Sequence, residues 1–358
     1  MIVCPVGLST GCFYKQPIFE VLEPIQASGF SILEITSSPS HLDFHDLPRV
    51  REAATRIADL GLEVHSYHAP FGLHLDITSP DDFLRESSVE EILFSMEAAV
   101  TLGARYFTLH PGSDTDHFVA ESEIGQRREN ALLSLDRIAA RCREMGLELL
   151  LENMLPQQLF GRISDLLWFR EMTAGGSLGL CFDVGHANLG GNVYMTAYRL
   201  AEHTCIIHAH DNYLYADEHL LPGKGRIDWG RLMEILYGCG FDGTVILELS
   251  GEHNGTPLAF LGEAREAAKL LRQFLLPAVS SARRLIKKKR ARSTFSSRCS
   301  RIGHHEFHPQ VPGSSPPGCG DDQVRFSTPW PSPLGPICSD AVGAPDPGPW
   351  FRIQRIER

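Results

Sequence analysis

Residues 108–112 read TLHPG, residues 150–154 read LLENM and residues 206–212 read IIHAHDN, and in each stretch an apolar run ends in a residue that can bind a metal. The same pattern recurs in SYHAP (66–70), CFDVGHA (181–187) and ILELSG (246–251). A strand that lines the core of a barrel carries Ile, Leu and Val along its length, and only at its carboxyl end can a charged side chain reach the mouth. The pattern therefore predicts metal ligands that converge at the carboxyl ends of parallel strands.

Short apolar runs alternate with amphipathic stretches along the first three quarters of the chain. We expect strands at residues 2–8, 31–35, 63–68, 105–110, 148–152, 178–183, 205–210 and 245–249. Helical spacing separates them, as in Leu135, Ile138 and Cys142, which recur on one face of a helix. Repeated βα units of this number favour closure into an α/β fold of the (β/α)8 TIM barrel type, and no GxGxxG turn indicates an open nucleotide-binding sheet.

The 358 residues, 43% of them hydrophobic, suffice for one such barrel and an appended segment. We place the barrel at residues 1–280 and expect residues 281–358, a basic run followed by Pro-, Gly- and Ser-rich sequence, to be disordered. Neither a signal peptide nor an apolar run of about 20 residues is found, so we expect a cytoplasmic protein that does not enter a membrane.

Charge is distributed unevenly along the chain. The formal net charge is −11, but residues 1–280 carry 20 Lys and Arg against 38 Asp and Glu. Such an acidic surface repels a phosphate backbone unless metal ions and a local basic strip offset it. We therefore expect a small-molecule partner rather than a nucleic acid.

A first metal site follows from the strand ends. Glu152 and Glu248 end the predicted fifth and eighth strands, and Asp183 and His208 end or nearly end the sixth and seventh. Two carboxylates then face two further ligands across the barrel mouth. Carboxylates with a single imidazole suit Mn²⁺, Mg²⁺, Co²⁺ or Zn²⁺, so we expect one divalent metal ion of this group as the cofactor.

Further ions are conceivable at the same mouth. His68 and His110 lie on the third and fourth strands next to Glu152, which could bridge to a second metal. A third set is formed by residues from two loops, namely His186, Asp217 and His219.

A structural role competes with each of these assignments. A single histidine at a strand end is more often a hydrogen-bonded structural residue than a ligand. That explanation would have to hold independently at six strand ends, and buried carboxylates without a cation carry a large desolvation penalty. Lys224, in the loop sequence GKG, could bind a phosphate or carboxylate of a substrate, although an exposed loop lysine is usually only solvated.

The motifs HAPF, LHPG, LLENM, FDVGHA, HAHDN, DEHLLPGKGRIDW and LELSG resemble those of the xylose isomerase-like TIM barrel superfamily. This superfamily joins sugar isomerases and epimerases to three-zinc apurinic-site endonucleases. The resemblance covers residues 1 to about 278, and it is greatest to the group labelled sugar phosphate isomerase/epimerase. It also allows a homo-oligomer, because related barrels often dimerise or tetramerise.

Similarity to the ketose epimerases implies that Glu152, Asp183, His208 and Glu248 hold one metal, with Glu152 and Glu248 acting as acid and base. His68 and His186 would then contact a small carbohydrate substrate. One departure concerns the arginine that follows the metal-binding histidine in those epimerases, because Asn212, Tyr213 and Leu214 follow here.

Similarity to the endonucleases implies a different reaction. The positions that would hold three zinc ions are all filled, by His68, His110, Glu152, Asp183, His186, His208, Asp217, His219 and Glu248. The departures are the HAHDN turn, a short loop before Asp217 and the lack of a basic strip for bent DNA. We therefore favour metal-dependent isomerisation or epimerisation of a sugar, sugar phosphate or related hydroxy-keto compound over zinc-dependent phosphodiester hydrolysis. A non-catalytic barrel that keeps its ligands is a third alternative.

Overall fold

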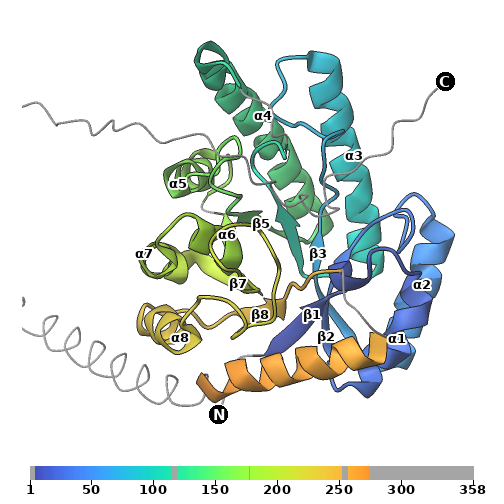
Figure 1. Ribbon diagram of the computed structural model, residues 1–358. Coiled ribbons are helices and arrows are strands. Elements are labelled where there is room, and N and C mark those ends of the chain that lie inside the picture. Colours follow the sequence, from blue (N-terminus) through green and yellow to red (C-terminus); the bar gives the residue numbers. More distant parts are fainter. Residues whose placement is uncertain (1–4, 115–118, 177, 252–256, 275–358) are drawn as a thin grey trace, which may run out of the picture. The chain divides into compact units, whose positions relative to one another are not determined.

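The computed structural model describes residues 5–114, 119–176, 178–251 and 257–274. Parallel strands close into a barrel in sequence order (Figure 1). Their bounds are β1 Val6–Ser9, β2 Ile32–Thr36, β3 Glu63–His68, β4 Tyr106–Leu109, β5 Glu148–Glu152, β6 Gly179–Asp183, β7 Thr204–Ala209 and β8 Thr244–Leu247. The predicted (β/α)8 barrel is confirmed, and β2 to β8 agree with the predicted strands within two residues at either end.

Helices connect consecutive strands and surround the barrel (Figure 1). Their bounds are η1 Thr10–Phe13, α1 Ile18–Ala27, α2 Leu47–Asp59, α3 Asp82–Thr101, α4 Glu121–Met145, α5 Ile163–Met172, α6 Val184–Leu189, α7 Val193–Leu200, η2 Ala201–His203 and α8 Trp229–Gly238. Residues 257–274 are also helical. The predicted disordered segment and its boundary at residue 280 lie outside the described residues.

The amphipathic pattern of the helices accounts for the outer core. In α4 the buried side chains include Leu135, Ile138 and Cys142, which are one turn apart and face the sheet. The strands supply the other side of this layer through residues such as Phe107, Leu151 and Phe182. Among the described helices, none is both long enough and apolar enough to cross a membrane.

A second, smaller core lies inside the barrel. It contains Tyr106, Leu150, Cys181, Ile206 and Ile246, which are all buried. Because side chains of a strand alternate between its two faces, the residue two positions further along points inward as well. That rule brings Thr108, Glu152, Asp183, His208 and Glu248 to the next interior level, toward the carboxyl ends of their strands.

Candidate metal centre

The first group of candidate ligands forms at the ends of β5, β6, β7 and β8. One ligand atom each of Glu152, Asp183, His208 and Glu248 can be chosen so that all lie within 4.8 Å of one another. Nδ1 of His208 is 3.0 Å from Oε1 of Glu152 and 3.3 Å from Oε2 of Glu248. We call these four residues the oxygen-rich group, because three of them offer carboxylates.

Burial destabilises the charged forms of the side chains in this group. Glu152, Asp183 and His208 are buried, whereas the side chain of Glu248 keeps 20% of its surface exposed. Burial alone would raise the pKa of Glu152, but His208, His110 and His68 outweigh it and hold that pKa well below its usual range. Burial alone would lower the pKa of His208, but the acidic groups around it raise it well above its usual range. Positive charge is thus required between these carboxylates, and either protons or a metal ion can supply it.

Asp183 also caps the N-terminus of α6. It is the last residue of β6 and the N-cap of α6, where its Oδ1 accepts a hydrogen bond from the backbone N–H of His186 at 2.6 Å. Asn153 holds the backbone of Asp183 through hydrogen bonds at 2.8 and 2.9 Å. Asp183 is therefore fixed by its neighbours before any ligand binds.

Sequence reasoning missed Glu34, which lies directly behind His208. This carboxylate on β2 is fully buried, and its Oε2 is 3.0 Å from Nε2 of His208 and accepts a hydrogen bond from Oγ of Ser66 at 2.8 Å. A carboxylate on the outer nitrogen of an imidazole fixes the tautomer that leaves the inner nitrogen free to bind a metal. The signal was available, because Glu34 interrupts the apolar run ILEIT at an inward-facing position.

The second group consists of His68, His110 and Glu152. Nε2 of His68 and Nε2 of His110 are 3.2 and 3.6 Å from Oε2 of Glu152. The outer nitrogens are also engaged, since Nδ1 of His68 is 2.9 Å from the carbonyl of Ala69 and Nδ1 of His110 is 2.9 Å from Asp114. Burial alone would lower the pKa of His110, but Asp114 and Glu152 raise it to about 10. The two oxygens of Glu152 face different groups, so this side chain is placed to bridge two ions.

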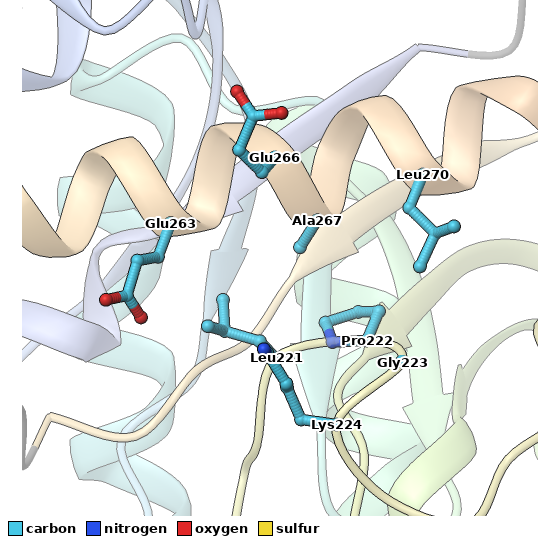
Figure 2. A pocket seen from close by; sticks show the side chains of 8 residues that line it. All are labelled: Leu221, Pro222, Gly223, Lys224, Glu263, Glu266, Ala267 and Leu270. Carbon is cyan, nitrogen blue, oxygen red and sulfur yellow. The ribbon is translucent and has the colours of Figure 1, made fainter.

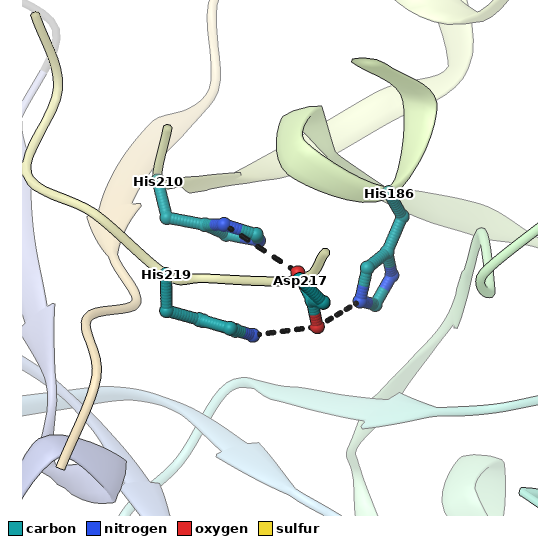
Figure 3. Close-up of side chains that lie close together, drawn as sticks. All are labelled: His186, His210, Asp217 and His219. Atoms are coloured by element: carbon teal, nitrogen blue, oxygen red, sulfur yellow. Dashed lines mark hydrogen bonds and ion pairs between the residues drawn. The ribbon is translucent and has the colours of Figure 1, made fainter. Parts of the chain in front are cut away.

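The third group contains His186, Asp217 and His219, as predicted, together with His210. We call these four residues the imidazole-rich group (Figure 3). Burial alone would lower the pKa of His219, but Asp217 raises it to about 10. Sequence reasoning missed His210, although the spacing of HAHDN puts it on the same face as His208.

Lys224 and His186, both predicted to contact a substrate, have different surroundings. Lys224 is exposed and lines a cavity of about 530 Å³ with Glu263, Glu266 and Leu270, and it belongs to none of the three groups (Figure 2). In His186 both ring nitrogens face protein atoms, with Nδ1 2.9 Å from the carbonyl of Asn153 and Nε2 3.3 Å from Asp217. That arrangement suits the alternative role of His186 as a metal ligand.

Comparison with known proteins adds relatives of two kinds. The sequence profile described as "Xylose isomerase-like TIM barrel" matches residues 22–274. The D-psicose 3-epimerase of Ruminiclostridium cellulolyticum is 23% identical over 66% of this chain and 79% of its own length. A probable endonuclease 4 of Mycoplasmoides gallisepticum is 26% identical over 54% of this chain and 66% of its own.

Among solved structures, that of a D-tagatose 3-epimerase-like protein matches with a TM-score of 0.66 and 24% identity. The match covers 77% of this chain and 99% of the other. At this level of identity the likeness concerns the fold. The named relatives thus include a sugar epimerase and a probable endonuclease, which agrees with the two alternatives left by the sequence.

Proposed function

Because this chain belongs to the xylose isomerase-like TIM barrel family, we propose that it is a divalent-metal-dependent isomerase or epimerase of a small sugar, sugar phosphate or related hydroxy-keto compound. The observation that carries this proposal is the placement of two carboxylates around one imidazole. Glu152 from β5 and Glu248 from β8 both lie within 3.3 Å of Nδ1 of His208. The side chain of Glu248 keeps 20% of its surface exposed, whereas Glu152 is buried.

The oxygen-rich group fits a divalent cation by its donors. Glu152, Asp183, His208 and Glu248 would hold it, and the donor set of three carboxylates and one imidazole suits Mn²⁺, Mg²⁺, Co²⁺ or Zn²⁺. Such a cation would polarise a ketose carbonyl and its neighbouring hydroxyl, which lowers the energy of the negative charge that develops when a carbon-bound proton leaves.

The protein's own carboxylates would move the proton. Glu152 is held ionised by its histidine neighbours, so it can accept a proton from the carbon next to the carbonyl. The pKa of Glu248 is also lowered: burial would raise it, but His208 and His219 outweigh that effect. Glu248, a second carboxylate near the same ring nitrogen of His208, would return a proton to the opposite face of the planar enediolate, which inverts the carbon. His68, whose Nε2 is 3.2 Å from Oε2 of Glu152, would position that base.

Zinc-dependent hydrolysis of a phosphodiester at an abasic site is the second candidate. It is favoured by one specific observation, namely that all nine predicted ligands fall into three neighbouring groups. Two of these groups share Glu152, and the third lies next to Asp183. The acidic character of residues 1–280, with 38 Asp and Glu against 20 Lys and Arg, opposes binding of a DNA backbone. We therefore rank the carbohydrate reaction first.

One experiment separates the two reactions. The full chain is loaded in turn with Mn²⁺, Co²⁺ and Zn²⁺ and incubated in D₂O with a panel of ketoses, ketose phosphates and hydroxy-keto acids. We expect mass spectrometry to detect incorporation of one carbon-bound deuterium into at least one of them. The same preparations are given a duplex with a single abasic site, and efficient incision without any deuterium exchange would reverse the ranking. Inactivity in both assays with all three metals would indicate a non-catalytic barrel.

A further inference from the structure

We propose that His210 completes the predicted set of His186, Asp217 and His219 into a closed zinc site with four protein ligands, separate from the site of the reaction. His210 is the fourth ligand, and its presence leaves the ion no open position. A structural ion is thus assigned to the imidazole-rich group, which the proposed function does not use.

Three imidazole rings converge on the carboxylate of Asp217 (Figure 3). Nε2 of His186 and Nε2 of His219 are 3.3 and 3.0 Å from Oδ2 of Asp217. Nδ1 of His210 is 3.9 Å from Oδ1 of the same residue. A tetrahedral zinc ion bound at about 2.0–2.1 Å holds its ligand atoms about 3.4 Å apart, which is close to the spacing of these atoms. The rings of His210 and His219 are stacked, with centroids 3.8 Å apart and 9° between their planes, so one of the two rings must turn for both to bind the same ion.

Each imidazole has its outer nitrogen fixed by a hydrogen-bond acceptor. Nδ1 of His186 lies 2.9 Å from the carbonyl of Asn153, and Nδ1 of His219 lies 3.0 Å from the carbonyl of Glu248. Nε2 of His210 lies 2.9 Å from Oδ2 of Asp183. When these outer nitrogens donate, all three inner nitrogens turn their lone pairs toward Asp217, which is the tautomer that histidine ligands adopt in metal sites.

Two polar atoms inside the group have no hydrogen bond of their own. They are Nδ1 of His210 and Oδ1 of Asp217, which lack a hydrogen-bond partner among the described residues and face each other. His210 is completely buried, so water does not compensate. A lone pair on each atom and no proton between them is unfavourable, whereas a cation bound by both satisfies them together.

The backbone is arranged to direct these rings. His219 has a φ of 46°, in the left-handed region that non-glycine residues rarely occupy, and this turn directs its ring to Asp217. The ring of His210 packs against the backbone of Gly185, where a Cβ would lie 1.9 Å from Cε1 of His210. Only glycine at position 185 therefore leaves room for the fourth ligand.

The donor set identifies the metal and its role. Three imidazoles and one carboxylate favour Zn²⁺, and four protein ligands are typical of structural zinc sites, whereas catalytic sites keep a position for water or substrate. The ion would join α6, the end of β7 and the loop from residue 210 to residue 228. A closed site cannot supply a reacting hydroxide, which weighs against a hydrolytic reaction that uses all three groups.

The test separates this site from the oxygen-rich group. The Glu152→Gln variant of the full chain weakens both groups that contain Glu152, and we expect it to retain one tightly bound Zn²⁺ after dialysis. Substituted with one equivalent of Co²⁺, it should show the intense visible absorption of four-coordinate cobalt. Adding His210→Asn should weaken zinc binding at least tenfold in a chelator competition and reduce that absorption. His74→Asn, which removes an exposed histidine from the same background, should change neither.

A measurement on the unmutated chain guards against misfolded variants. With one equivalent of Zn²⁺ and an excess of Mn²⁺, X-ray absorption at the zinc edge should show four ligands, three of them imidazoles. A zinc ion with five or six oxygen-rich ligands would overturn the proposal. So would equal zinc affinity with and without His210, or a Glu152→Gln variant that folds and retains no zinc.

Discussion

The oxygen-rich and imidazole-rich groups lie side by side and differ in almost every property that decides what a metal ion does. The first has three carboxylates, of which Glu248 is partly exposed, and the second has three imidazoles around Asp217. The first comes entirely from strand ends, whereas the second takes Asp217 and His219 from the loop after β7. On the proposals made above, the oxygen-rich group holds the catalytic ion and the imidazole-rich group holds a structural ion in the same barrel mouth.

The two groups are nevertheless mechanically joined. Asp183 is a candidate ligand of the first group and accepts a hydrogen bond from His210 of the second. Glu248 contributes its side chain to the first group, while its carbonyl oxygen is 3.0 Å from Nδ1 of His219. An ion in one group should therefore affect the order of the other.

The largest effect is expected when Glu152 is replaced by Gln, because this removes a proton acceptor and a ligand together. We expect deuterium exchange into the substrate to fall by about 10³-fold or more, since general acid–base catalysis alone contributes about 10² to 10⁴. The measurement is the rate of exchange with D₂O at saturating Mn²⁺.

The control for Glu152→Gln is a second glutamate on β5. Glu148 begins β5 at the opposite end, where it is exposed and pairs with Arg105 at 2.9 Å. Glu148→Gln should leave the exchange rate within about twofold, because surface ion pairs contribute little. If both variants lose activity to the same degree, the loss reflects the stability of β5 and the oxygen-rich group is not the reaction site.

Metal removal should affect the stability of the fold next most strongly. An ion present at about 100 times its dissociation constant stabilises the native state by about 2.7 kcal/mol, which corresponds to about 5–10 °C in Tm for a domain of this size. We expect Zn²⁺ added to chelator-treated protein to restore this difference. The gain should be reduced in His210→Asn and kept in His74→Asn. An unchanged Tm on chelation would show that neither group binds tightly.

Sequence reasoning worked best for the residues at strand ends. Glu152, Asp183 and His208 each follow an inward-facing apolar residue by two positions, so their direction depends only on the alternation of a strand. The barrel itself was predictable for the same reason, because every strand and most connecting helices carry a local periodic pattern. Whether these side chains bind metal stays a prediction.

Residues whose role depends on register or on a loop path were harder. Glu34 acts through His208, which is 174 positions further along the chain, and only closure of the barrel brings the two together. His210 could have been found, because it lies two positions after His208, but its partner Asp217 is brought to it by a loop without a periodic pattern. Lys224 follows in the same loop and lines a separate cavity.

A substitution at Gly185 should disturb the imidazole-rich group without removing a ligand and without changing a residue of the oxygen-rich group. In Gly185→Ala the new Cβ would lie 1.9 Å from Cε1 of His210, so the ring must move away from Asp217. We expect zinc affinity of this group to fall by about 10- to 100-fold, as when a residue that orients a ligand is lost. Chelator competition measures it.

Another glycine gives the control for Gly185→Ala. No heavy atom lies within 4 Å of a Cβ built at Gly238, the last residue of α8, so Gly238→Ala should not change zinc binding. Should Gly185→Ala bind zinc as tightly as the unmutated chain, His210 would not be the fourth ligand.

The smallest effect concerns a buried histidine that has no carboxylate partner. His41 is buried, with Nδ1 2.6 Å from the carbonyl of Gln16, and burial lowers its pKa, in contrast to the raised pKa of His219 beside Asp217. The unfolded chain therefore takes up a proton at His41 below about pH 6.5, before the folded protein does. This contribution to stability is present above that pH and is lost as the pH falls toward the folded pKa, with a slope of at most about 1.4 kcal/mol per pH unit.

Replacing His41 by Gln should therefore flatten the acid side of the stability curve, measured by urea unfolding of metal-free protein between pH 5 and 8. His45, four residues further along the chain, provides a control of opposite sign. Burial lowers its pKa, but Asp43 and Glu91 together outweigh burial and raise it overall, so its contribution is present at low pH and is lost as the pH rises. His45→Gln should thus leave the acid side as steep as before. A curve that is equally steep in both variants would trace the acid sensitivity to the carboxylates of the metal-binding groups. The pKa values of Glu152, Asp217 and Glu248 are lowered in the folded protein, so their contribution to stability is lost as the pH falls.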